Sequence, residues 1–162
     1  MRTTIAVLAL TVLALSGVPA GAAEGAAGEM EVTKNPALLV SPSVQVGKLT
    51  VYGVKLGDSV EKIPGIAGVT RQPSDRPQDA VYTGRTAWYF AFEGKIYQIK
   101  VLGDITKAMP PHDAIRLQMV LGKADEVTQT ETGVTSLSYF TRHVHFTCRA
   151  SKGVSSVDLY AP

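Results

Sequence analysis

A run of alternating side chains in the middle of the chain constrains the fold more than any other feature. Apolar residues predominate in Ala80–Thr83 and Thr86–Phe92, and the two-residue period of a β-strand would place their side chains alternately on its two faces. Between them, Gly84-Arg85 is a two-residue loop of the Gly-X kind, which favours a type II′ hairpin. Glu93-Gly94-Lys95 then turns the chain into a third strand over Ile96–Leu102. This stretch therefore predicts a three-stranded antiparallel meander.

The same two-residue period returns near the C-terminus and predicts a second meander. The strands expected there are Val134–Phe140, Arg142–Arg149 and Val154–Tyr160. In the middle strand, Val144, Phe146 and Cys148 share one face by parity. We expect this face to be the core face, so Cys148 is predicted to be a buried thiol that packs as a small hydrophobic residue.

A short helix is expected before each meander. Asp58 and Glu61 have the spacing of a capping box at a helix start, and Pro64-Gly65 ends that helix after little more than one turn. The second helix is predicted over Pro110–Leu121, with Gly122 closing its C-terminus. Its apolar residues lie on more than one side, so we expect it to be well buried.

The order helix, loop, three-strand meander thus occurs twice along the chain. The last strands of the two copies match in their apolar positions at a constant offset of 58 residues, as in Val101 and Leu159. We predict an α+β fold of two tandem helix-plus-antiparallel-meander units, which form a mostly antiparallel sheet packed with short helices. The single domain spans residues 44–162, with unit one at about 44–103 and unit two at about 104–162.

The first 22 residues are predicted to be a signal peptide. The apolar run Ile5–Leu15 has about eleven residues, well short of the ~20 that a membrane-spanning helix needs. Ala20-Gly21-Ala22 supplies the small-x-small pattern of a signal-peptidase site. Residues 23–43 are expected to form a flexible leader. The protein is therefore predicted to be secreted or periplasmic, with no membrane span.

Charge and cysteine content narrow the partners that we expect. The chain has 16 Lys and Arg against 14 Asp and Glu, without a basic cluster, so nucleic acid is not an expected partner. Cys148 is the only cysteine, so the domain has no internal disulfide and depends on its hydrophobic core. A lipid anchor is not expected either, since no cysteine lies near Ala20.

Two segments carry a family resemblance. Gly53–Val60 (GVKLGDSV) and Val120–Val127 (VLGKADEV) resemble segments of the β-lactamase-inhibitor-protein-like fold, which includes the SmpA/OmlA-type envelope lipoproteins. The resemblance implies a short helical portion packed on an antiparallel sheet, in one unit or two in tandem. It also implies a protein that holds other proteins with its sheet or loops. The chain lacks the lipidated cysteine of those lipoproteins and the disulfides of the inhibitor proteins.

The aromatic residues of the first meander suggest both a core and a binding surface. Trp88, Phe90 and Phe92 share one strand face, which we interpret as the core face, with an open binding surface as the alternative. The opposite face, the hairpin tip and the preceding loop then supply the exposed contacts. The predicted binding residues are Tyr82, Arg85, Tyr89, Tyr97 and Arg71.

No motif in the sequence predicts catalysis or a cofactor. His143 and His145 stand two apart on an expected strand and could reach one metal ion, but a third ligand is not evident, so no metal is predicted. There is no Gly-x-Ser-x-Gly elbow, and a buried Cys148 is a poor nucleophile. We expect a non-enzymatic exported module that binds another envelope or secreted protein. The alternatives are a small-molecule or lipid binder lined by the aromatic stripe, and a metal-dependent secreted enzyme that uses the two histidines.

Overall fold

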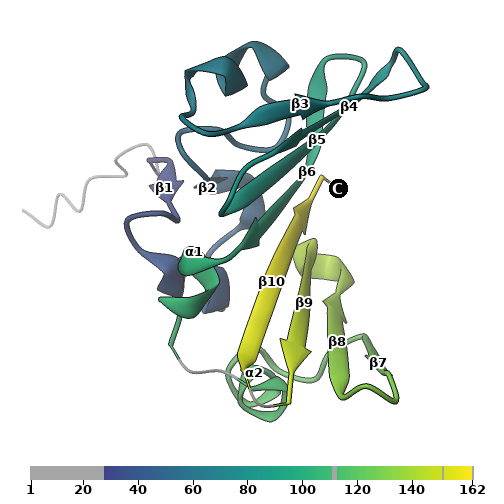
Figure 1. The fold of residues 1–162 in the computed structure, drawn as a ribbon. Helices are drawn as coiled ribbons and strands as arrows, with labels where there is room; N and C mark the ends of the chain where they lie inside the picture. Colours follow the sequence, from purple (N-terminus) through teal and green to yellow (C-terminus); the bar gives the residue numbers. More distant parts are fainter. Residues whose placement is uncertain (1–27, 111–112, 151, 162) are drawn as a thin grey trace, which may run out of the picture.

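One eight-stranded sheet dominates the computed structural model of the chain, which describes residues 28–110, 113–150 and 152–161 (Figure 1). All neighbouring strands in this sheet are antiparallel. Its strands are β3 (Thr70–Gln72), β4 (Asp79–Thr83), β5 (Ala87–Phe92), β6 (Lys95–Leu102), β7 (Glu126–Gln129), β8 (Val134–Tyr139), β9 (Val144–Arg149) and β10 (Gly153–Tyr160). The predicted α+β class with a mostly antiparallel sheet is confirmed. The predicted signal peptide and residues 23–27 of the predicted leader lie outside the described residues.

The strand order is β3-β4-β5-β6-β10-β9-β8-β7, so two runs of consecutive strands meet at β6 and β10. At this seam Val101 lies opposite Val157, and Ile99 lies opposite Leu159. Each run contains one strand more than predicted, β3 in the first and β7 in the second. The sequence predicts neither strand, because Thr70–Gln72 and Glu126–Gln129 lack apolar alternation.

The hairpin between β4 and β5 was predicted, but its turn differs from the expected type. A type II′ turn requires a positive φ at its first central residue, and Gly84 is not among the glycines with positive φ. Instead, the Gly84 N–H donates to the Ala87 carbonyl at 2.9 Å. A Cβ at Gly84 would lie 2.9 Å from Cγ2 of Val69, so glycine is needed here for close packing. The next hairpin, at Glu93 (φ 48) and Gly94 (φ 76), has the two positive φ angles of a type I′ turn.

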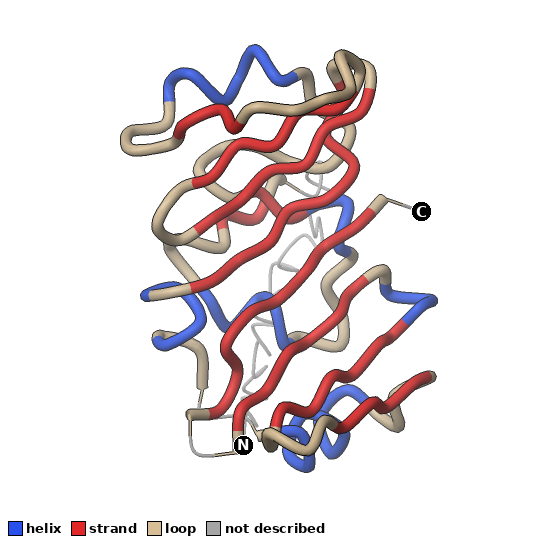
Figure 2. The backbone as a smooth tube through the Cα atoms, turned by 45° about the vertical axis from the view of Figure 1, so that its right-hand side comes forward, coloured by secondary structure: helices blue, strands red, loops and turns tan. Residues whose placement is uncertain are grey.

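Short segments cover one face of the large sheet (Figure 2). They comprise the parallel strands β1 (Met30–Glu31) and β2 (Leu49–Thr50), the 3₁₀ helices η1 (Pro36–Val40), η2 (Val46–Lys48) and η3 (Val60–Gly65), and the helices α1 (Asp104–Lys107) and α2 (Ala114–Leu121). A further 3₁₀ helix, η4 (Phe140–Arg142), links β8 to β9. No helix among these described elements has the length and apolar composition needed to cross a membrane.

The predicted flexible leader is wrong for its described part. Val32, Leu39 and Val40 are buried in the core, so residues 30–43 belong to the covering layer. The sequence pattern does not predict this burial, because Pro36 and the surrounding turn residues interrupt any strand or helix period. The chain adopts a 3₁₀ helix instead, in which two successive apolar side chains are buried.

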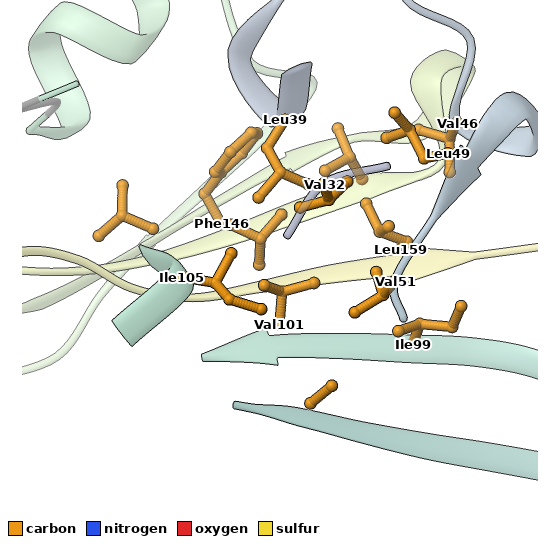
Figure 3. Packing of buried hydrophobic residues seen from close by; sticks show 14 of the residues in the cluster. Val32, Leu39, Val46, Leu49, Val51, Ile99, Val101, Ile105, Phe146 and Leu159 are labelled. Atoms are coloured by element: carbon orange, nitrogen blue, oxygen red, sulfur yellow. The ribbon is translucent and has the colours of Figure 1, made fainter. Parts of the chain in front are cut away.

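The core lies between this layer and the inner face of the large sheet. In Figure 3, residues of the layer such as Val32, Leu39 and Val51 face strand residues that include Ile99 and Leu159. The strand residues at these positions are fully buried. Burying one such aliphatic side chain contributes roughly 1.5–3 kcal/mol, so this interface is the main source of stability.

The predicted second helix is confirmed at its C-terminal end, but it begins at Ala114 instead of Pro110 and is less buried than expected. The Asp113 side chain caps α2 by accepting hydrogen bonds from the Ile115 and Arg116 N–H groups, and Gly122 follows with φ 88. Only Leu117 is fully buried, whereas Ile115 is 73% exposed and Met119 is 79% exposed. The reason is position, since the eight-residue helix lies against β8 and η1 near one edge of the sheet.

A single carboxylate fixes the start of the covering layer. Glu31 accepts hydrogen bonds from the Thr33 N–H (3.1 Å) and hydroxyl (2.6 Å), from the Thr50 hydroxyl (3.0 Å), and from the Tyr52 (3.0 Å) and Gly53 (2.8 Å) N–H groups. Burial alone would raise the pKa of Glu31, but the hydrogen bonds from Thr33, Gly53 and Thr50 outweigh it and lower the pKa.

Replacing this carboxylate should loosen the layer. We expect Glu31→Gln to lower the free energy of unfolding at neutral pH by about 1–3 kcal/mol, because charge-assisted hydrogen bonds are lost. The lowered pKa means that this contribution is complete above the ordinary carboxyl pKa and is lost as the pH falls through the folded-state value. Denaturant unfolding should therefore show a difference in the free energy of unfolding between the two proteins that is smaller in acidic than in neutral buffer.

Glu29→Gln is the matched control, because Glu29 makes an exposed ion pair with Lys55. This substitution should lower the free energy of unfolding by less than about 1 kcal/mol. An equal decrease in the free energy of unfolding in the two variants would show that Glu31 has no special role.

The burial of Cys148 gives a test of the register of β9. It is buried, and this burial raises the pKa of its thiol to about 11. It should react slowly with a water-soluble maleimide in the native protein and quickly in guanidinium. Cys148→Ser should lower the free energy of unfolding by about 1–3 kcal/mol, because it buries a hydroxyl without a partner. Cys148→Ala should lower it by less. Rapid labelling of the native protein would contradict the register of β9.

Candidate functional site

The face of the large sheet opposite the core is left open by the described residues, and we call it the outer face. A row of cross-strand partners runs across its centre from β8 to β5. The row consists of Ser138, His145, Asp158, Lys100 and Trp88, each directly opposite the next. Four of these five side chains are polar or charged, whereas the opposite face of the same strands is apolar. The open face is therefore polar at its centre.

Asp158 is the anchor of this row. It is buried, and its Oδ1 accepts a hydrogen bond from Nε2 of Gln98 at 2.9 Å, while its Oδ2 lies 3.4 Å from Nζ of Lys100. A buried carboxylate is costly unless it is paired in this way. The pairing holds the Gln98 amide and the Lys100 ammonium in fixed positions beside it.

A shallow hollow of about 400 Å³ lies around this anchor on the outer face. Its lining combines two phenol rings with four polar side chains. The lining residues are Tyr97, Gln98, Lys100, His145, Asp158 and Tyr160. Tyr97 reaches this side because the register of β5 and β6 shifts between Phe90 and Ala91, which leaves Tyr97 as the extra residue of a β-bulge.

The serine, histidine and aspartate of the row do not have the connections of a hydrolase triad. In such a triad the serine bonds Nε2 of the histidine, and the aspartate bonds Nδ1. Here Nδ1 of His145 contacts the Ser138 hydroxyl at 3.0 Å, and the Asp158 oxygens contact Gln98 and Lys100. The hydroxyl of Ser138 therefore lacks the Nε2 contact that a triad serine makes.

Large aromatic side chains flank the polar centre on the β5–β6 side. Trp88 is 37% exposed, Phe92 is 46% exposed and Tyr97 is 45% exposed. The Trp88 indole N–H donates to the Gly84 carbonyl at 3.0 Å, which orients the ring. The interpretation of Trp88, Phe90 and Phe92 as the core face is therefore wrong.

The core face of β5 is the other one, where Tyr89 stands between Ala87 and Ala91. All three are buried, and the Tyr89 hydroxyl donates to the Val51 carbonyl at 3.0 Å. The two alanines leave room for the covering layer, and that carbonyl satisfies the only polar atom of the tyrosine side chain. Tyr89 is fully buried, so the prediction that it makes an exposed contact is wrong. The same burial raises the pKa of its hydroxyl.

The structure brings only one of the five predicted binding residues, Tyr97, to the outer face. Tyr82 pairs with Tyr89 across β4 and β5 and packs half-buried against the core, and Arg71 is its neighbour on β3. Arg85 is exposed at the hairpin tip, where its guanidinium lies 3.0 Å from the Asp104 carboxylate.

The histidine pair expected on one strand does not form. Strand β9 begins at Val144, and His143 precedes it in the left-handed conformation (φ 54), with its ring edge-on to Tyr160 at 5.9 Å. Within residues 28–110, 113–150 and 152–161, no three His, Cys, Asp or Glu side chains are grouped to hold a metal ion. The premise of the metal-dependent alternative, two histidines side by side on a strand, is thus wrong.

A larger hollow of about 690 Å³ lies at the end of β10, beside the segment 42–47. Arg142 borders it, but its guanidinium donates to the Pro42 carbonyl at 3.0 Å and to the Ser41 carbonyl at 2.7 Å. Arg142 therefore ties the covering layer to the β8–β9 connection. Tyr160 lines both hollows.

Comparison with known proteins adds little to this site. No protein-family model and no curated protein matches the chain. One solved structure, a DUF4309 family protein (YjgB) from Bacillus subtilis, is similar with a TM-score of 0.45 and 14% sequence identity, over 81% of this chain and 96% of that chain. A likeness at this level carries no argument about function. The resemblance to the β-lactamase-inhibitor-protein-like fold stays a prediction.

Proposed function

We propose that this protein is an exported, non-enzymatic module that binds a partner protein on its outer face. The observation that carries the proposal is the exposure of Trp88, Phe92 and Tyr97 around a fixed polar centre on an uncovered sheet. Trp and Tyr are the residues that most often dominate binding energy at protein interfaces. Asp158, Gln98 and Lys100 add oriented hydrogen-bonding groups that would set the position of the partner.

The size of the outer face favours a macromolecular partner over a small ligand. Eight strands at about 4.8 Å spacing and about 20 Å length give a face of roughly 700 Å². A standard protein interface buries about 800 Å² on each partner. A site for a small molecule would instead enclose most of its ligand, whereas the hollow at Tyr97 is shallow and Trp88 borders none of the described hollows.

The predicted signal peptide and the strand order support two further parts of the proposal. A cleavable signal over residues 1–22 places the module in the periplasm or outside the cell. Two runs of four consecutive strands that meet at β6 and β10 fit two tandem units, each with its last strand at the centre. In this arrangement the outer face is shared by both units.

A matched pair of phenylalanine variants tests the proposed surface. Phe92 is 46% exposed on the outer face, and Phe140 is 52% exposed on η4, beyond the end of β8. The immobilised mature protein is used to capture a partner from secreted and envelope fractions, and the affinity of that partner is then measured. We expect Phe92→Ala and Tyr97→Ala each to weaken binding by about tenfold or more, and Phe140→Ala to leave it unchanged.

Equal affinities for the Phe92→Ala, Tyr97→Ala and unaltered proteins would contradict the proposed surface. Loss of binding in Phe140→Ala alone would move the interface to the opposite end of the sheet.

A further inference from the structure

The described part of the chain leaves backbone groups of the β7 edge unpaired. All four residues of β7 are exposed, and the Thr130 N–H, one residue beyond the strand, donates to the Val134 carbonyl of β8 at 2.9 Å. In an antiparallel pair, alternate residues bond to the same neighbour. Thr128 and Glu126 therefore also face β8, and the backbone groups of Val127 and Gln129 point away from the sheet.

The opposite edge of the sheet is better protected than the β7 edge. Edge strands are commonly shielded by shortness, charged side chains or proline. Strand β3 has three residues, Arg71 at its centre and Pro73 directly after it. Strand β7 pairs with β8 over four residues without a bulge, and it contains no proline and no basic residue.

An uncovered apolar helix face lies beside this open edge. Ile115 and Met119 are one turn apart on α2 and are among the most exposed large apolar residues described. Ile115 and Gln129 of β7 line the same hollow, so α2 lies next to the edge strand. Val127 is opposite the buried Leu137, so its half-exposed side chain lies on the same face of the sheet as α2.

We propose that the β7 edge pairs with the β7 edge of a second copy of this chain, with Ile115, Met119 and Val127 of both copies packed across a twofold axis. We call these three residues the β7–α2 patch. A strand is the partner that would pair with the exposed backbone groups. The adjoining apolar residues would pack against an apolar surface that lies at a fixed distance from that strand. A second copy supplies both at the same spacing, as an isologous interface requires.

The sequence of β7 is complementary to itself in this arrangement. Pairing the outward backbone groups of Val127 with those of Gln129 in the second copy places Thr128 opposite its own counterpart on the axis. Cross-strand threonine pairs are favourable, and like charges directly opposite each other are not. Glu126, the only charged residue of β7, then lies opposite Thr130, so no two like charges face each other within the paired β7 strands. The sheet would continue from one copy to the other, with both outer faces on the same side.

The oligomeric state of the mature chain tests this proposal. We expect sedimentation equilibrium to show a dimer whose dissociation constant lies below about 1 mM. The variant Val127→Lys with Met119→Lys puts two like charges from each copy against the other, and it should raise the dissociation constant by about 100-fold. Both positions are exposed, so circular dichroism should show an unchanged fold.

The matched control is Phe92→Lys with Tyr97→Lys, which adds the same charge at exposed aromatic positions of the outer face. It should dimerise like the unaltered protein. If the double lysine variant of the patch does not fold, Val127→Pro removes one outward N–H while sparing the bonds to β8, and it should also weaken the dimer.

Three results would overturn the proposal. They are a monomer up to about 1 mM, a dimer that survives the patch variants, and a dimer that is lost equally in the outer-face control. None of them depends on whether the outer face binds a partner protein.

Discussion

The pairing of β6 with β10 is the contact on which the rest of the fold depends. It joins two runs of four strands into one sheet, and its inward side chains, Ile99, Val101, Val157 and Leu159, are all fully buried. At roughly 1.5–3 kcal/mol for each buried aliphatic side chain, this seam contributes a large part of the stability of a marginally stable domain. Either run alone would expose this apolar edge, so the two halves should fold together.

The covering layer then decides which face of the sheet remains open. Glu31 ties β1 to the turn at Tyr52 and Gly53, and the Tyr89 hydroxyl bonds to the Val51 carbonyl from the sheet side. Arg142 holds the segment at Ser41 and Pro42 from the other run of strands. Because these polar links lie around the core on one side, the layer is fixed there. On the other side of the sheet, the outer face keeps Trp88, Phe92 and Tyr97 exposed.

Sequence reasoning succeeded where one face of an element was clearly apolar or where a cap marked its end. Strands β4, β5, β6, β8, β9 and β10 followed from their two-residue period, and the C-terminal end of α2 followed from Gly122. Strands β3 and β7 were missed because edge strands of polar composition carry no period. In β9 parity placed Val144, Phe146 and Cys148 correctly in the core, since the intervening residues are polar.

The candidate site was harder to predict because both faces of β5 are apolar. Period alone cannot choose between Trp88, Phe90 and Phe92 on one side and Ala87, Tyr89 and Ala91 on the other. The larger side chains suggested the core, but the close approach of the covering layer favours the alanines. The row from Ser138 to Trp88 depends on the register of five strands, and no local sequence pattern predicts such long-range pairing.

The orientation of β5 can be measured directly, since Trp88 is the only tryptophan in the chain. Acrylamide, which is neutral and unaffected by the nearby Lys100, quenches indole fluorescence according to exposure. With the outer face open, Trp88 should be readily quenched in the native protein, with a quenching constant that is a substantial fraction of the value in guanidinium. A strongly protected Trp88, with blue-shifted emission that moves to the red only on unfolding, would place the aromatic stripe in the core and contradict the open outer face.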